Sequence, residues 1–187
     1  MTDIKTESES KTGIELVKDE RYALAARFHS VFLNFDPYKP KFANQTGTRF
    51  LLFPTDSYHL TAAQFGAFSA AIEPRRKHQF FISEIGWGRD SFEKGRHYLC
   101  NGPTFDEYTS LKIGVENAIY STDGAWGFLL SDELHAIVAC DDAFLKLFEA
   151  QYPLTKDLTK FLSYWNAIRQ EGTDIDWLEP LCNKLSR

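Results

Sequence analysis

NAIYSTDGAWGFLLSDELHAIVAC, residues 117–140, is the stretch that decides the fold. It holds three apolar runs of strand length, which are separated by Asp123-Gly124 and by Asp132-Glu133. Short polar breaks of this kind are typical of tight turns between paired strands. A fourth apolar run lies just upstream and ends before Gly114. The spacing predicts an antiparallel meander with strands at Tyr108–Ile113, Asn117–Ser121, Trp126–Ser131 and His135–Cys140.

Two more strands are expected nearer the N-terminus, at Thr48–Phe53 and His78–Ile85. With the meander they make a sheet of about five to six strands. The intervening segment Gly86–Phe105 is rich in glycine, and we expect it to be an irregular loop.

Helices are expected at both ends of the chain. Glu20–Phe35 has apolar side chains at three- and four-residue spacing, which places Tyr22, Ala25, Phe28, Phe32 and Phe35 on one inward helical face. A capping box formed by Thr61 and Gln64 should begin a second helix, which Pro74 ends. We expect three C-terminal helices: one after Asp141, one beyond Pro153 and one over Trp177–Leu185.

This order of elements predicts an α+β fold, in which helices from both chain ends pack on a predominantly antiparallel sheet. Residues 1–13 contain few apolar side chains, so burial cannot offset the entropy lost on ordering them. We therefore expect a disordered N-terminal tail over 1–13 and a single α+β domain over 14–187.

Charge and cysteine content narrow the classes of function. The net charge of -5, from 26 acidic and 21 basic side chains, does not favour nucleic acid, and the densest basic run, Arg75-Arg76-Lys77-His78, is short. The polar N-terminal residues lack the apolar core of a signal peptide, and no apolar run is as long as a membrane span. The three cysteines form no CxxC pair or disulfide framework, which fits a reducing compartment. We expect a cytoplasmic protein without a nucleic-acid or membrane partner.

Motifs for metal, cofactor or nucleophilic chemistry are missing from the sequence. The five histidines have no HExxH or i, i+4 spacing, and Gly86-Trp87-Gly88 lacks the third glycine of a dinucleotide site. No GxSxG elbow is present either. We therefore expect no metal, no cofactor and no assigned catalytic residue.

The region 84–107 is the most informative stretch for function. It combines aromatic side chains and arginines with acidic groups, the composition of protein interfaces. The alternative is a loop that folds over the core and buries its aromatics. If it is an interface, the partner-binding residues are Trp87, Arg89, Asp90, Glu93, Arg96, Tyr98, Asp106 and Glu107.

A second pattern runs through the meander: Glu116–Ser121, Gly124–Gly127, Ser131, His135–Ala139 and Phe144. It resembles small bacterial cytoplasmic proteins, several of them of the toxin-immunity type. The resemblance implies an inhibitor that binds one cognate toxin domain. A modest acidic excess would then help to steer a basic partner such as a nuclease.

These observations predict a non-catalytic binding protein, of the immunity or antitoxin type, with a protein partner. A small hydrolase or transferase is the first alternative, and it would require Glu84, Asp90, His97 or His135 to converge in one cleft. A homo-oligomeric structural protein is the second, and the sequence leaves monomer and homodimer open.

Overall fold

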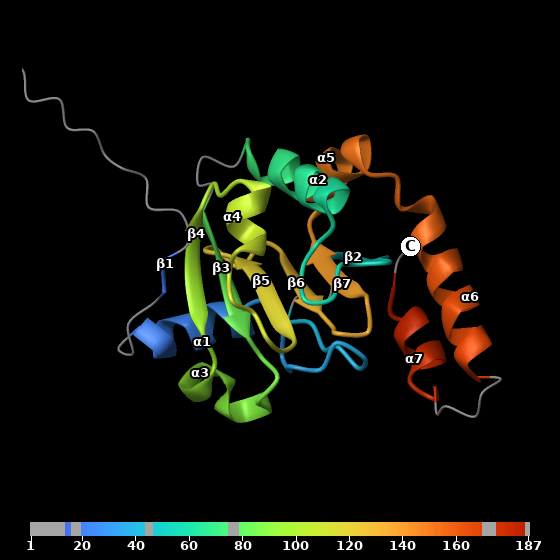
Figure 1. The fold of residues 1–187 in the computed structure, drawn as a ribbon, viewed down its shortest axis with the longest axis horizontal. Coiled ribbons are helices and arrows are strands. Elements are labelled where there is room, and N and C mark those ends of the chain that lie inside the picture. Colours follow the sequence, from blue (N-terminus) through green and yellow to red (C-terminus); the bar gives the residue numbers. More distant parts are fainter. Residues whose placement is uncertain (1–13, 16–19, 44–46, 75–78, 170–174, 186–187) are drawn as a thin grey trace, which may run out of the picture.

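The computed structural model describes residues 14–15, 20–43, 47–74, 79–169 and 175–185. The predicted disordered tail, residues 1–13, lies outside this described part. Within it, an antiparallel sheet is flanked by helices, which confirms the predicted α+β class (Figure 1).

The described sheet has the strand order β1-β4-β3-β5-β6-β7-β2, and every neighbouring pair is antiparallel. Six strands have four to six residues, close to the expected five to six strands, and a two-residue β1 extends one edge. The strands are β1 Ile14–Glu15, β2 Thr48–Leu52, β3 Gln79–Glu84, β4 His97–Asn101, β5 Asn117–Ser121, β6 Gly127–Leu130 and β7 Ala136–Cys140.

Helices cover both faces of the sheet. One face carries α2, α4 and α5, and the other carries α1, α3, α6 and α7 (Figure 1). The helices are α1 Arg21–His29, α2 Ala62–Ile72, α3 Ser91–Lys94, α4 Phe105–Thr109, α5 Asp142–Gln151, α6 Asp157–Arg169 and α7 Leu178–Cys182, with short 3-10 turns η2 Gly88–Asp90 and η3 Leu154–Lys156.

Burial on both faces explains why the strands have nearly continuous apolar sequences. In β3, Phe80 and Ile82 face the α2 side, and Phe81 faces the α1 side. Both cores are rich in aromatic rings, such as Phe68 on the inner side of α2 and Phe28 on the inner side of α1. A sheet buried on both sides has no solvent-facing positions for alternate polar residues.

Two local predictions about the helices are confirmed. Thr61 and Gln64 form the reciprocal capping box at the start of α2. Asp141 accepts a hydrogen bond from the Phe144 amide at the start of α5.

The predicted irregular loop Gly86–Phe105 was wrong, because it contains η2, α3 and strand β4. β4 pairs with β3 in the register Ile82↔Tyr98, which is a tertiary contact that local composition does not reveal. The predicted strand Tyr108–Ile113 was also wrong. Thr104 and Glu107 form a second capping box there, so the chain enters helix α4 instead.

The first helix is shorter than predicted, and one residue of its predicted inward face is not buried. The helix ends at His29, after which the chain turns and Leu33 donates to the Lys41 carbonyl at 2.7 Å. Phe28 and Phe32 are buried, and Ala25 and Phe35 pack against the same core. Leu24 and Phe28 face the sheet, whereas the predicted inward residue Tyr22 is 87% exposed. This difference creates the candidate functional site.

Candidate functional site: a cleft between α1 and α3

A cleft of about 1150 Å³ lies between α1, the turn that follows it and α3. We refer to it as the α1–α3 cleft. It is lined by Arg21, Tyr22, Ala25, His29, Leu33, Phe35, Arg89, Phe92, Glu93 and Lys94.

The outer wall of the cleft is formed by one side of α1 and by Leu33. Tyr22, Ala25 and His29 lie three and four residues apart, which places them on one side of α1. Beyond the helix, Leu33 is 57% exposed. The exposed apolar surface of this wall is therefore that of Tyr22 and Leu33, and two large exposed apolar side chains at one cleft suit a partner.

The floor of the cleft is a packed set of aromatic rings. Phe35 stacks on Phe28 at 4.9 Å between ring centroids, and Phe92 lies edge-on to Phe28 at 5.5 Å. Phe28 is fully buried and also contacts Tyr120 of the sheet. The floor is therefore anchored to the core and should keep its shape without a ligand.

Charged groups stand around this apolar surface. Arg21 Nη1 donates to the backbone carbonyl of Glu93, which ties α1 to α3. Lys94 pairs with Asp90 at 2.6 Å, one helical turn away. Arg89 is exposed, and in the described part of the chain its side chain has no hydrogen bond or ion pair.

Four of the predicted partner-binding residues lie at or beside this cleft. Arg89 and Glu93 line it, Asp90 pairs with the lining Lys94, and Trp87, 39% exposed, lies two positions before Arg89.

The other four predicted residues lie elsewhere. Arg96 holds the buried Glu84, and the Tyr98 ring is buried with its hydroxyl 3.3 Å from the Lys112 carbonyl. Asp106 and Glu107 lie on α4, which packs on the other face of the sheet, where the Glu107 carboxylate caps its own helix.

Sequence reasoning missed Arg21, Tyr22 and Leu33 as candidate site residues. A signal was present: Leu24 is apolar but lies off the face predicted from Tyr22, Ala25 and Phe28. The buried face is centred on Leu24 and Phe28, with Ala25 at its edge, and this leaves Tyr22 outside.

The groups named for an enzymatic alternative do not converge. Glu84 and His97 lie on adjacent strands, but Glu84 reaches Gly114 on the α4 side, while the His97 ring stacks on Phe92 on the α1 side. His135 is fully buried against Tyr38 and Trp177, beside α7. Asp90 is exposed at the α1–α3 cleft.

A chain of buried polar groups lies under the cleft floor. Nδ1 of His97 is 2.9 Å from Oγ of Ser83, which is 2.8 Å from the Tyr120 hydroxyl. Burial lowers the pKa of His97, and the nearby charge of Arg21 lowers it further. Ser83 is fully buried behind Phe92, so this serine–histidine pair could meet a substrate only if α3 moved.

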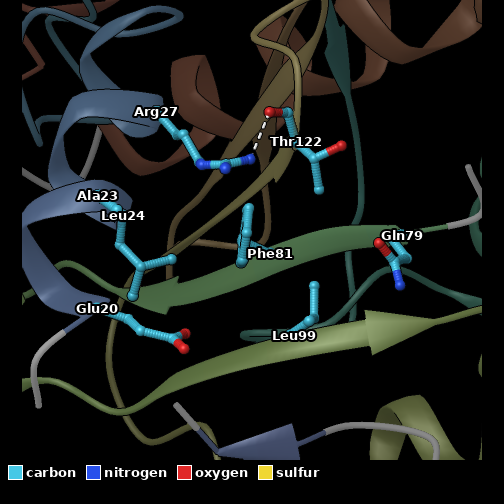
Figure 2. A pocket seen from close by; sticks show the side chains of 8 residues that line it. All are labelled: Glu20, Ala23, Leu24, Arg27, Gln79, Phe81, Leu99 and Thr122. Carbon is cyan, nitrogen blue, oxygen red and sulfur yellow. Dashed lines mark hydrogen bonds between the residues drawn. The ribbon is translucent and has the colours of Figure 1, made fainter. Parts of the chain in front are cut away.

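A smaller pocket of about 380 Å³ lies on the opposite side of α1, over β3 and β4 (Figure 2). The guanidinium carbon of Arg27 lies over the Phe81 ring, 5.4 Å from the ring centroid. Nη1 of Arg27 donates to the Thr122 carbonyl at 2.7 Å. Its guanidinium is therefore occupied in holding α1 to the β5–β6 turn. We regard this pocket as part of the attachment of α1 rather than as a site.

The described residues contain no group of three or more histidine, cysteine, aspartate or glutamate side chains placed to hold a metal ion. None of their helices is both long and apolar enough to cross a membrane.

Comparisons with protein-family models, curated proteins and solved structures found no match to this chain. The expectation of an immunity-type protein therefore depends on the sequence pattern and on the geometry of the cleft.

Proposed function

We propose that this chain is a non-catalytic binding protein of the immunity or antitoxin type. It would act in the cytoplasm and neutralise a toxin domain by direct binding at the α1–α3 cleft. The observation that carries the proposal is the distribution of exposed apolar side chains. Of the four large ones in the described residues, Tyr22 and Leu33 line this cleft, and Trp87 is two positions before the lining residue Arg89.

Several features support a protein as the ligand. The cleft exceeds the roughly 300–1,000 Å³ typical of small-molecule sites, and it is shallow enough for Tyr22 to be almost fully exposed. Tyrosine, tryptophan and arginine at its border are the side chains that most often dominate interface energies. A packed aromatic floor lowers the entropy cost of association, because little has to be ordered on binding.

The partner should be encoded beside this gene, because an immunity protein is useful only when it is inherited with its toxin. We would express the C-terminal domain of each neighbouring reading frame and test for growth arrest. Co-expression of this chain should restore growth, and the purified proteins should form a complex.

Variants then locate the interface. Tyr22→Ala and Trp87→Ala should each weaken the complex by about 10- to 1000-fold, the range for central interface residues. Their thermal unfolding should stay close to that of the wild type, because both side chains are exposed. Tyr164→Ala is the matched control: its side chain is 37% exposed, and it belongs to α6, which lies away from α1 and α3 (Figure 1), so its loss should leave binding unchanged.

Two results would overturn the proposal. One is that no neighbouring product binds this chain. The other is a stable homodimer that Tyr22→Ala converts to monomer, which would make the cleft a self-association surface.

A further inference from the structure

We infer that the partner segment seated in the α1–α3 cleft is acidic as well as apolar. This inference rests on the proposed function and specifies the chemistry of the partner's contact surface. It reverses the expectation from net charge, because a chain of charge -5 would be expected to favour a basic partner.

The charge lining the cleft is opposite in sign to that of the whole chain. Three cations line it, Arg21, Arg89 and Lys94, against one anion, Glu93. Asp90 stands just outside and offsets Lys94, to which it is bonded at 2.6 Å. Arg21 and Arg89 then remain against Glu93 alone, so the charge that a ligand meets in the cleft is positive.

Arg89 is free to bind a carboxylate, and Arg21 adds a fixed positive charge beside it. Arg89 is exposed and unpaired within the described residues. Arg21 lines the cleft and is held in place by its bond to the Glu93 carbonyl, so its charge is fixed there. The exposed guanidinium of Arg89 suits bidentate binding of a carboxylate, and the fixed charge of Arg21 adds to the attraction.

The apolar surface between these cations defines the rest of the ligand. Tyr22 and Leu33 are exposed above a floor of Phe35 and Phe92, so apolar side chains of the partner can be buried there. An amphipathic helix that presents apolar residues at i, i+3 and i+4, with acidic residues beside them, would satisfy both features. A small anion would leave most of the 1150 Å³ cleft empty.

The test uses the full chain and two fluorescein-labelled helical peptides. Both peptides carry leucine and phenylalanine at i, i+3, i+4 and i+7, and all other positions are glutamate in one and lysine in the other. Fluorescence polarisation should give the acidic peptide an affinity about tenfold or more above that of the basic one. Tyr22→Ala should weaken the binding of both peptides.

Matched variants separate local charge from net charge. Arg89→Glu should reverse the preference between the peptides. Lys146→Glu changes the net charge equally but lies on exposed α5 surface across the sheet, so it should leave the order unchanged. Glu93→Lys should increase the affinity for the acidic peptide, because it replaces the one anion that lines the cleft with a cation.

Equal effects of Arg89→Glu and Lys146→Glu would overturn the inference, as would tighter binding of the basic peptide or no binding of either. These failures are distinguishable from failure of the proposed function. A toxin complex that Tyr22→Ala weakens but Arg89→Glu leaves intact would support the immunity proposal and reject an acidic partner. Binding of the acidic peptide without any toxin partner would do the reverse.

Discussion

Arg96 clamps the buried carboxylate of Glu84 through two side-chain nitrogens, with Nη2 2.6 Å from Oε1 and Nε 3.1 Å from both oxygens. The Glu84 side chain is 1% exposed, and that of Arg96 is 38% exposed. Glu84 also accepts bonds from the amides of Arg96 and Gly114, so it joins β3, β4 and the segment before β5. This ion pair fixes the end of the sheet from which η2 and α3 project.

We expect Arg96→Met to destabilise the fold by about 3–5 kcal/mol, because it leaves a buried carboxylate without its cation. Glu84→Gln should cost less, about 1–3 kcal/mol, because the amide can still accept the Gly114 bond. In the double variant the two costs should be clearly less than additive. Urea unfolding monitored by tryptophan fluorescence measures all three, and fully additive costs would contradict the coupling.

The ion pair of Arg96 and Glu84 also predicts that stability depends on pH. Burial alone would raise the pKa of Glu84, but the bonds from Arg96 and Gly114 outweigh it and lower the pKa below its ordinary value. The stabilisation is therefore present above the ordinary carboxyl pKa and is lost as the pH falls through the folded-state value. Glu84→Gln should lose less stability than the wild type over that acid range.

A second prediction concerns Gly127, which allows the chain after α1 to lie close to the sheet. A Cβ at this position would lie 2.6 Å from Cε2 of Phe32 and 2.9 Å from Cγ1 of Val31. Gly127→Ala should therefore destabilise the protein by about 1–3 kcal/mol, the usual cost of overpacking. It should also displace the turn that carries Leu33 and Phe35 into the cleft.

Gly66 provides the matched control for this substitution. It lies inside α2, where an added Cβ meets no atom within 4 Å. Gly66→Ala should stabilise the protein by about 0.5–1 kcal/mol, because alanine is the better helix former. Thermal unfolding of both variants checks the pair, and a stabilised Gly127→Ala would rule out the close packing described here.

Local signals in the sequence were sufficient for much of the fold. The turns at Asp123-Gly124 and Asp132-Glu133 identified β5, β6 and β7, since hairpin partners are neighbours in sequence. The capping residues Thr61 and Asp141 marked two helix starts. Thr104 with Glu107 carried the same signature but was missed beside the apolar run that follows it.

The candidate site was harder to predict because it depends on what α1 packs against. Periodicity shows that Tyr22 and Ala25 share a helical face, but only tertiary contacts decide that Leu24 and Phe28 are the residues buried. For the same reason, only some of the predicted partner-binding residues in the region 84–107 reach the cleft. Arg89 and Glu93 meet α1 at the cleft, whereas Arg96 turns inward to Glu84.

The last prediction concerns His135, whose ring is fully buried between aromatic side chains. It lies parallel to Trp177 with centroids 6.0 Å apart, and it meets Tyr38 and Phe161 at angles. Its Nδ1 is 3.3 Å from the Glu133 carbonyl. Burial lowers the pKa of His135 to about 4, because an imidazolium would lose its hydration there.

This shift links His135 to stability in mild acid. In the unfolded chain a histidine has a pKa of about 6.5, so below that pH the unfolded state takes up a proton that the folded state excludes. The contribution of neutral His135 is therefore complete above pH 6.5 and decreases as the pH falls towards 4. At about 1.4 kcal/mol per pH unit, the loss over that interval is about 3 kcal/mol.

His135→Phe isolates this contribution, because phenylalanine keeps a ring beside Trp177 but cannot be protonated. Comparison with the wild type at each pH cancels groups common to both proteins, including Asp157, whose pKa is raised by burial and so acts in the opposite direction. Urea unfolding at pH 7 and pH 4 should show the variant gaining about 3 kcal/mol relative to the wild type. If both proteins lose stability in parallel over that range, His135 is not a neutral buried group, and its packing against Tyr38 and Trp177 must differ from that described here.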